Sequence, residues 1–478
     1  MAQILSGGIG DLLAEFIEVR RRTLSLFKPL RIEDAVIQPN VFGSPPNWHL
    51  AHVTWFYQKI LQKHGQEIHS DENVNLEYLN SYYQQFGKIL PKSERGKFPR
   101  PTVEETLKYR SFIEEKVISF LNRAEDSSTE ISDELKYDIM LANQHEMQHQ
   151  ELMIYDFQYY FQRFPDPEDN YKPTTSTINT TNTTNTTPIV AATASATVYK
   201  KPKRDCPQVG EVTQKPRGMV EIPGGLYELG FSGGNDHFCY DNELPEHKVY
   251  LQPFKIDVAP VTNAEYIKFI EDDGYDDFSF WLADGWDLVK EEKWKAPLYW
   301  ERKGDIWMKK DFRGLRKIEP DEPVTNLSYY EADAYANWAG KRLPTEAEWE
   351  KAASWNEDLQ KKTLYPWGDE KFTLKHANLL ESSLWGPSKI GSYPAGKSYY
   401  GCHHMIGDVW EWTSSEYTLY PGFKSKLSEY TDKWAINQKV LRGGSFSTPC
   451  KQIRNTYRNY FKPHERILFS GFRCVSES

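Results

Sequence analysis

The chain is poor in cysteine, in long apolar runs and in excess positive charge. Its five cysteines among 478 residues are scattered and form no CxxC pair, which indicates a reducing compartment and no disulfide framework. No apolar run approaches the roughly 18 residues that a membrane-spanning helix needs. The first residues lack a basic stretch followed by an apolar core, so no signal peptide is expected. These absences predict a cytoplasmic protein that does not insert into a membrane.

The net charge of −10 argues against nucleic acid or an anionic membrane surface as a partner, because both carry negative charge themselves. The chain is rich instead in apolar and aromatic residues, which make up 39% and 14% of it. That supply is enough for a large core, and the length suggests two or three domains. The composition is typical of a soluble enzyme.

One domain boundary is visible in the composition. Residues 173–200 are rich in Thr and Asn and have no periodic apolar positions until their end. Such a segment does not bury enough apolar surface to fold. We therefore expect a flexible linker at 173–205 between a first domain, residues 1–172, and a second, residues 206–478.

The part before the linker has the pattern of a helical bundle. Helices are expected near 9–28, from Ser44 and Pro45 onward, from Thr102 onward, and over 133–164. Ser44 is the expected cap of its helix, with Pro45 in the first turn, and Thr102 begins a Thr-x-x-Glu capping box. Four such helices make a bundle, and bundles build metal sites from side chains that project inward.

The part after the linker has a different texture, in which Gly and Pro are frequent and helical periods are short. Two short helices are expected at 328–339 and 346–353, with short strands and long loops elsewhere. The predicted fold class is therefore an α+β multidomain chain that begins with a four-helix bundle.

The main chemical signal is a pair of histidines, His145 and His149, inside the last helix of the bundle. Residues four apart lie one turn apart on the same face, so both imidazoles can bind one metal ion. The run around them is polar, which is costly inside a bundle unless the polar groups are satisfied, and a ligand role explains it. His49 and His52 compete for the place of third ligand. Imidazole ligands suit iron, copper or zinc.

The same spacing also matches His-Glu-x-x-His. In that motif Glu146 would be a general base beside zinc, as in metalloproteases. The second half of the chain argues against this interpretation, because its motifs point to other chemistry.

Several segments together resemble one known family. In the first half they are residues 44–56, 80–83, 100–105 and 145–151; in the second half they are residues 260–263, 342–350, 365–368, 407–412, 441–446 and 471–473. The first set resembles the DinB-like N-terminal domain of ergothioneine-type sulfoxide synthases. The second set resembles their formylglycine-generating-enzyme-like domain, a modified C-type-lectin fold. The resemblance covers nearly the whole chain outside the linker.

The resemblance implies a non-haem Fe(II) enzyme that uses O2, a thiol and hercynine (Nα-trimethylhistidine). Such an enzyme joins the sulfur to the imidazole ring and oxidises it to a sulfoxide. At the matching positions the Fe(II) ligands are His52, His145 and His149, and His49 has a supporting or packing role. Gln148 matches a glutamine that hydrogen-bonds the substrate imidazole.

Two further groups in the first half are candidates for substrate chemistry. Tyr82 or Tyr83 resembles the tyrosine that supplies a proton, a task that suits a phenol; the alternative is a pair that only caps the bundle. Arg95 and Arg100 lie in one loop. A guanidinium can clamp a substrate carboxylate through two parallel hydrogen bonds, and the alternative is a solvated basic loop.

The segment that resembles the hercynine contact lies near the C-terminus. An amide at Asn459 can bind a carboxylate, and the ring of Tyr460 can face a trimethylammonium group. One branch of the family has an acidic residue where Phe461 stands and uses γ-glutamylcysteine, so Phe461 favours free cysteine as the thiol.

The expected activity is formation of hercynylcysteine sulfoxide in ergothioneine biosynthesis. Three alternatives remain: the same chemistry on histidine, as in ovothiol biosynthesis; a selenium-transferring homologue; and a non-catalytic ligand-binding module on the same scaffold. Formylglycine generation is rejected. That activity implies two copper-binding cysteines, and the matching positions here are Thr448 and Ile453.

Overall fold

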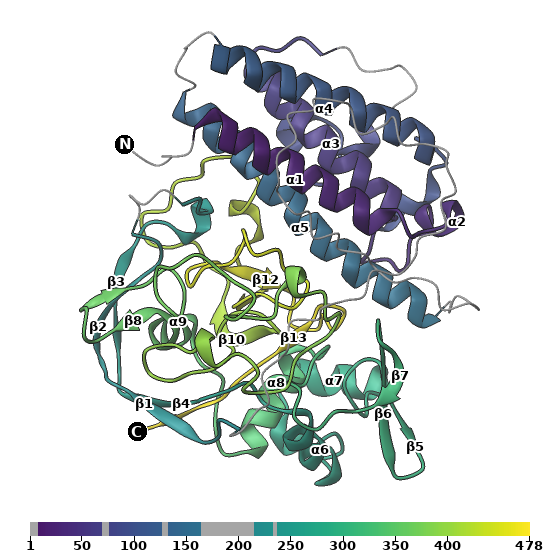
Figure 1. The fold of residues 1–478 in the computed structure, drawn as a ribbon. Coiled ribbons are helices and arrows are strands. Elements are labelled where there is room, and N and C mark those ends of the chain that lie inside the picture. Colours follow the sequence, from purple (N-terminus) through teal and green to yellow (C-terminus); the bar gives the residue numbers. More distant parts are fainter. Residues whose placement is uncertain (1–7, 69–75, 127–131, 164–214, 233–236) are drawn as a thin grey trace. The chain divides into compact units, whose positions relative to one another are not determined.

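The computed structural model describes residues 8–68, 76–126, 132–163, 215–232 and 237–478. The predicted linker at 173–205 lies outside these residues. The chain divides into two compact units: Met1–Cys206 with Gly234–Phe238, and Pro207–Gly233 with Cys239–Ser478 (Figure 1). The predicted fold class, an α+β multidomain chain with an N-terminal helical domain, is confirmed.

The first unit is a bundle of four long helices. They are α1 (Ile9–Phe27), α3 (Pro46–Lys63), α4 (Val103–Asp126) and α5 (Asp133–Arg163), with a short α2 (Ile32–Ala35) after the first. Helices α1 and α3 each contact both α4 and α5. Side chains from all four long helices fill its interior, among them Phe16, Phe56, Ile113, Val117, Ile139 and Ile154. The four predicted helices therefore exist, close to their predicted bounds.

The two predicted helix caps have different outcomes. Thr102 caps α4 as expected, since its hydroxyl accepts from the Glu105 backbone N–H at 3.2 Å while the Glu105 carboxylate accepts from the Thr102 N–H. Ser44 is not the cap of α3: the helix begins one residue later than expected, at Pro46, and Pro45 takes the cap position without a side-chain bond. The Ser44 hydroxyl instead accepts a hydrogen bond from Arg95 at 2.8 Å.

The second unit is built from small sheets joined by long loops. Its largest sheet has the order β12-β11-β10-β13, and a three-stranded sheet has the order β1-β4-β14. The strands of these two sheets are β1 (Met219–Ile222), β4 (Phe254–Asp257), β10 (Trp410–Glu416), β11 (Lys439–Arg442), β12 (Asn459–Phe461), β13 (Ser470–Gly471) and β14 (Val475–Glu477). Three smaller sheets contain β2 (Gly225–Leu229) with β3 (His247–Leu251), β5 (Trp300–Lys303) with β6 (Ile306–Asp311) and β7 (Gly314–Lys317), and β8 (Trp355–Asn356) with β9 (Lys361–Lys362).

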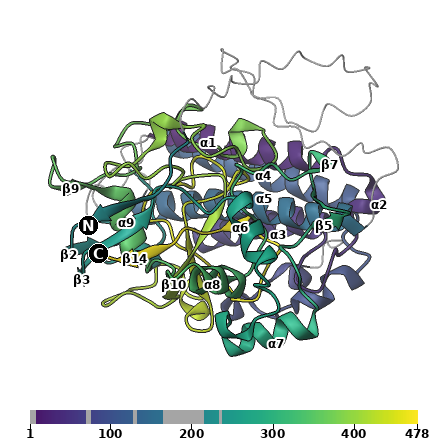
Figure 2. The same cartoon turned by 90° about the horizontal axis from the view of Figure 1, so that it is seen from below.

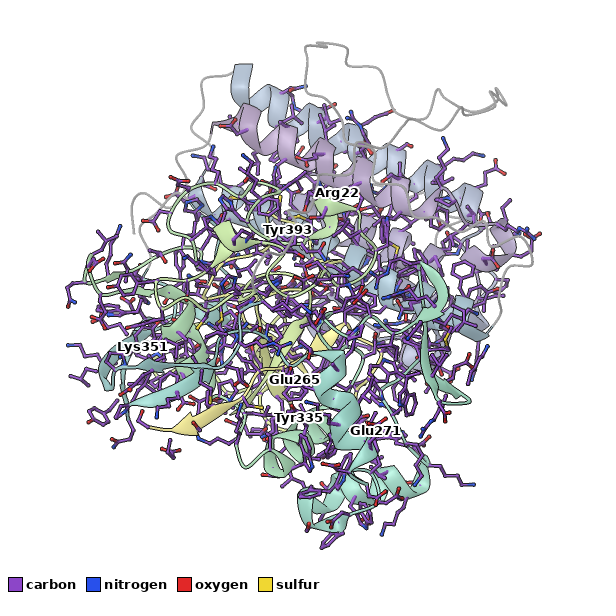
Figure 3. The ribbon with its side chains drawn as sticks, turned by 60° about the horizontal axis from the view of Figure 1, so that its bottom comes forward. Arg22, Glu265, Glu271, Tyr335, Lys351 and Tyr393 are labelled. Atoms are coloured by element: carbon purple, nitrogen blue, oxygen red, sulfur yellow. The ribbon has the colours of Figure 1, made fainter. Side chains whose placement is uncertain are left out.

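Four helices belong to this unit among the described residues. The predicted pair is confirmed as α8 (Tyr329–Trp338) and α9 (Glu346–Ser354), each with a capping box. Two more, α6 (Asn263–Glu271) and α7 (Ala283–Glu291), were not predicted from the sequence. Tyr335 of α8, labelled in Figure 3, stacks on Tyr266 of α6, with ring centroids 5.6 Å apart.

The core of the second unit lies around Trp349 of α9. This helix contacts β2, β3, β10 and β11, and Figure 2 shows it beside the antiparallel strands β2 and β3. The Trp349 ring is fully buried, and its Nε1 donates to Glu411 at 2.9 Å. Arg473 holds the same carboxylate from the C-terminal end of the chain, at 2.7 Å. A buried ion pair thus ties the last residues of the unit to its central sheet.

Four of the five cysteines lie among the described residues. Cys239, Cys402, Cys450 and Cys474 are free thiols. Within the described part of the chain, no helix is long and apolar enough to cross a membrane.

Candidate metal centre

Three histidines meet inside the first unit. Helix α3 supplies His52, and α5 supplies His145 and His149 one turn apart. One nitrogen from each ring lies within 4.8 Å of the other two, and the ring centroids are 4.6–5.0 Å apart. All three residues are buried, with His52 fully enclosed. The i, i+4 pair predicted from the sequence therefore faces a third histidine, and that histidine is His52.

The orientation of His52 is set by a backbone carbonyl. Its Nδ1 lies 2.6 Å from the Leu79 oxygen, which has only lone pairs to offer, so Nδ1 carries the proton. Its Nε2 then has a free lone pair, and that atom is buried without a hydrogen-bond partner among the described residues. The indole of Trp48 stacks on the ring at 4.5 Å and 10°. The lone pair of Nε2, buried beside two other imidazoles without a hydrogen-bond donor in the described part of the chain, is therefore available to bind a metal ion.

Burial keeps these imidazoles neutral. It lowers the pKa of His145 to about 3 and holds those of His52 and His149 well below their usual range. Neutral imidazole is the form that binds a metal, because the ligating nitrogen must offer a lone pair. Three neutral donors within reach of one point can bind a single divalent metal ion, Fe(II) among those that suit imidazole, and they leave coordination positions for other groups.

His49 does not join the three. Its Nδ1 lies 2.7 Å from Nδ1 of His149, and its Nε2 lies 3.1 Å from Oδ2 of Asp156. The alternative that His49 is the third ligand is thereby disfavoured, because both of its nitrogens face other partners. His49 thus forms a hydrogen bond with a proposed ligand, His149.

Glu146 points away from the histidine cluster. Its two oxygens bind Arg20 of α1, at 3.0 Å, and Arg110 of α4, and all three side chains are fully buried. Burial alone would raise the pKa of Glu146, but Arg110 and Arg20 lower it to about 2. A carboxylate held by two guanidinium groups is no general base, so the metalloprotease-like alternative has no base here.

Arg95 lies beside the centre. Its guanidinium carbon is 3.7 Å from the centroid of Trp48, whose ring also stacks on His52. Burial of the guanidinium lowers the pKa of Arg95 to about 9, although the nearby carboxylate of Asp156 acts in the opposite direction. Among the described residues Arg95 forms no ion pair, and its Nε is buried without a hydrogen-bond partner.

The other candidates of the first unit lie as follows. The hydroxyls of Tyr82 and Tyr83 are 3.0 Å apart; Tyr83 is fully buried against Phe56, which in turn packs on His145 at 4.3 Å. Gln148 lies on α5 next to His149 and is half-buried. Arg100 is exposed and pairs with Glu105 at 3.0 Å, so the structure does not bring it to the histidines.

The candidates of the second unit lie on β12. The Asn459 side-chain oxygen accepts from the Tyr460 backbone N–H at 2.9 Å, and the Tyr460 ring stacks on Tyr417 at 3.9 Å. Phe461 ends the strand and is half-buried.

Sequence reasoning missed the supporting residues. Asp156 lies seven positions after His149 on α5, two turns along the same face, and that spacing was a usable signal. Arg20 and Arg110 are more than 30 residues from Glu146, and their pairing with it follows only from the packed bundle.

Fold and site together define a two-part chain: a helical unit with a buried three-histidine centre, followed by a loop-rich unit of small sheets. The model of the DinB superfamily matches residues 15–153, and that of the sulfatase-modifying factor enzyme 1-like domain matches residues 206–478. The second match covers more than half of the chain, which therefore belongs to the sulfatase-modifying factor enzyme 1-like family.

Curated relatives carry two different activities in their names. The chain is 39% identical over 262 residues to a hercynine oxygenase of Mycolicibacterium smegmatis, and 40% identical over 251 residues to one of Mycobacterium tuberculosis. These matches cover 54% and 52% of this chain but only 60% and 58% of those two proteins. A formylglycine-generating enzyme of Thermomonospora curvata is 30% identical, over 55% of this chain and 94% of that protein.

Proposed function

We propose that this protein is a non-haem Fe(II)-dependent sulfoxide synthase that joins cysteine sulfur to the imidazole of hercynine with O2. The observation that carries the proposal is the set of three buried, neutral histidines in a DinB unit, in a chain related to hercynine oxygenases. In this centre Fe(II) would supply a Lewis acid for the thiol and the redox chemistry with O2. Hercynylcysteine sulfoxide is the product, which belongs to ergothioneine biosynthesis.

The protein's own groups then have defined tasks. His52, His145 and His149 hold the ion. Trp48 and Phe56 are buried against the imidazoles, and they keep bulk water from that side of the centre. Gln148, one residue before a ligand on α5, is assigned the hydrogen bond to the substrate imidazole.

Arg95 is assigned the carboxylate of the thiol substrate. The half-buried guanidinium of Arg95 lies against Trp48 and meets no carboxylate among the described residues, so an anionic ligand would offset its loss of solvation. Arg100 stays a weaker candidate for the same task, because it is exposed and already paired.

The tyrosine pair is assigned proton delivery. Burial raises the pKa of Tyr82 to about 12, against the hydrogen bond to Tyr83 and the charge of Arg95, so its phenol stays protonated at neutral pH. The O–O distance of 3.0 Å lets one hydroxyl replace the proton that the other gives away.

In the second unit, Asn459 and Tyr460 are assigned to hercynine. An amide can bind its carboxylate, and an aromatic face can attract its trimethylammonium group. Phe461, apolar where an acidic residue would favour γ-glutamylcysteine, supports free cysteine as the thiol.

The test is anaerobic reconstitution of the full chain with Fe(II), followed by O2 and cysteine with either hercynine or histidine. Mass spectrometry reads the products, γ-glutamylcysteine replaces cysteine in a parallel reaction, and His52→Ala is the control. Hercynylcysteine sulfoxide from the unaltered chain alone supports the proposal. Product only from histidine would show an ovothiol-type enzyme instead. Metal binding without any sulfoxide would favour the non-catalytic alternative.

A further inference from the structure

A buried hydrogen-bonded line runs from a carboxylate to one of the three histidines. Oδ2 of Asp156 accepts from the Ser44 backbone N–H at 3.0 Å and faces Nε2 of His49 at 3.1 Å. Nδ1 of His49 faces Nδ1 of His149 at 2.7 Å. All four residues are less than a tenth exposed, so water does not compete for these bonds.

The chemistry of the partners settles which atom donates at each step. A carboxylate only accepts, so Nε2 of His49 carries its proton towards Asp156. Nδ1 of a neutral His49 then has a lone pair, and Nδ1 of His149 must be the donor to it. Nε2 of His149 is left without a proton.

We propose that Asp156, acting through His49, is a positioning residue that fixes the tautomer of His149 so that its Nε2 is free to bind the metal. The inference rests on the proposed metal centre and adds to it residues outside the ligand set. Partners of this kind orient a ligand ring and make it more basic, and their loss typically lowers metal affinity about 10- to 100-fold. His52, the proposed ligand on α3, is fixed differently, by the Leu79 carbonyl.

Gly43 lies against the Asp156 carboxylate and helps to determine its position. A Cβ built on Gly43 would lie 2.9 Å from Cγ of Asp156 and closer still to its Oδ1, and it would also lie 2.8 Å from Cγ of Pro39. The loop before α3 can therefore approach the carboxylate only because residue 43 has no side chain. A methyl group there should push Asp156 away from His49 without altering any titratable group or any ligand.

Asparagine at position 156 separates hydrogen bonding from charge. The Ser44 N–H requires an acceptor at the Oδ2 position, so an Asn side chain should place its oxygen there. His49 would still donate to that oxygen, and the His149 tautomer would be kept. Alanine at 156 removes the acceptor altogether.

The chain offers a matched control. Asp138 of α5 binds His64, directly after α3, at 2.7 Å, and it is buried like Asp156. It joins the same two helices through another Asp–His pair, but its histidine does not face the centre. Gly8→Ala controls for a glycine substitution, because its added methyl group would meet no atom within 4 Å.

The experiment measures Co(II) and Fe(II) affinity of the metal-free full-length chain by chelator competition, with the Co(II) ligand-field bands as a spectroscopic signature. We expect Asp156→Ala and Gly43→Ala each to weaken affinity about 10- to 100-fold and to shift the Co(II) bands. Asp156→Asn should lose clearly less than Asp156→Ala. Asp138→Asn and Gly8→Ala should bind as the unaltered chain does. Far-UV circular dichroism of each variant is used to check that it is folded.

A double variant tests whether Gly43 acts through the carboxylate. If it does, Gly43→Ala should have little further effect in the Asp156→Ala background, because neighbours that share one contact are not additive. Unchanged affinity in Asp156→Ala, or an equal loss in Asp138→Asn, would overturn the inference. Failure of the unaltered chain to bind metal would instead overturn the proposed centre, and the two failures are read from different samples.

Discussion

At the scale of single residues, the centre depends on three imidazoles that stay neutral. We expect His52→Ala, His145→Ala and His149→Ala each to lose nearly all bound iron, since two imidazoles inside the bundle leave the ion short of ligands. His49→Ala should keep the ion with lower affinity, because His49 supports His149 and does not face the other two rings. Metal analysis of purified, refolded variants is the measurement. Full iron loading in all three ligand variants would show that these histidines do not form the metal site.

Glu146 gives a pH prediction. Its folded pKa of about 2 lies below the value of roughly 4.3 for an unfolded glutamate. The stabilisation from its ion pairs is therefore complete above about pH 4.3 and is lost as the pH falls towards 2. The shift corresponds to roughly 3 kcal/mol of folding free energy. Glu146→Gln should destabilise the bundle at neutral pH and flatten its acid dependence, as followed by helical circular dichroism in urea at several pH values. An unchanged acid profile would contradict this assignment.

The residues that sequence could identify are those with a local signal. His145 and His149 stand four apart, and that spacing alone places both on one face. The choice between His49 and His52 depended on resemblance, because both share a face of α3. Their separate roles follow from Leu79 and Asp156, which meet them only in the folded bundle.

At the scale of elements, long helices were predictable and short strands were not. Helix α5 ends within a residue of its predicted bound, because a helix of 31 residues offers many positions from which its period can be recognised. Strands β8, β9 and β13 have two residues each, too few for any period to appear. The predicted cap of α3 was wrong by one residue. A serine followed by a proline is the usual pattern of a cap and a first helical residue, but the helix begins at the second proline, Pro46.

The second unit is held by buried ion pairs between distant elements. Arg473 binds both oxygens of Glu411 on β10, at 2.7 and 2.8 Å, and both side chains are buried. Arg473→Ala would leave the carboxylate without this cation, and breaking such a pair costs about 3–5 kcal/mol. We expect a matching loss in the free energy of unfolding, followed by tryptophan fluorescence in denaturant.

The control for this prediction is an exposed pair in the same unit. Lys303 and Glu301 are 3.1 Å apart, and both side chains are more than half exposed. Pairs of that kind contribute about 0–1 kcal/mol, so Lys303→Ala should leave the unfolding curve nearly unchanged. Equal effects of Arg473→Ala and Lys303→Ala would show that the buried ion pair does not stabilise the second unit more than an exposed one.

At the scale of the whole molecule, the order of the two parts was recognisable because each carries its own motifs. The histidine pair marks the first part, and the segments around Trp349 and Trp410 mark the second. Neither set of motifs predicted which interactions hold each part together. Arg20, Glu146 and Arg110 in the first part come from three different helices, and no local pattern connects them.

The division of tasks between the parts gives the last prediction. All three proposed ligands and the His49–Asp156 support lie in the first part, so residues 1–172 expressed alone should bind one metal ion. Residues 206–478 should bind none at that affinity. Sulfoxide formation is expected only from the intact chain, because Asn459 and Tyr460, the proposed hercynine contacts, belong to the second part. Metal analysis, hercynine binding by calorimetry and product detection by mass spectrometry are run on each fragment and on the whole chain, after circular dichroism has shown that the fragments fold. Sulfoxide made by the first fragment alone would show that the second part does not hold hercynine.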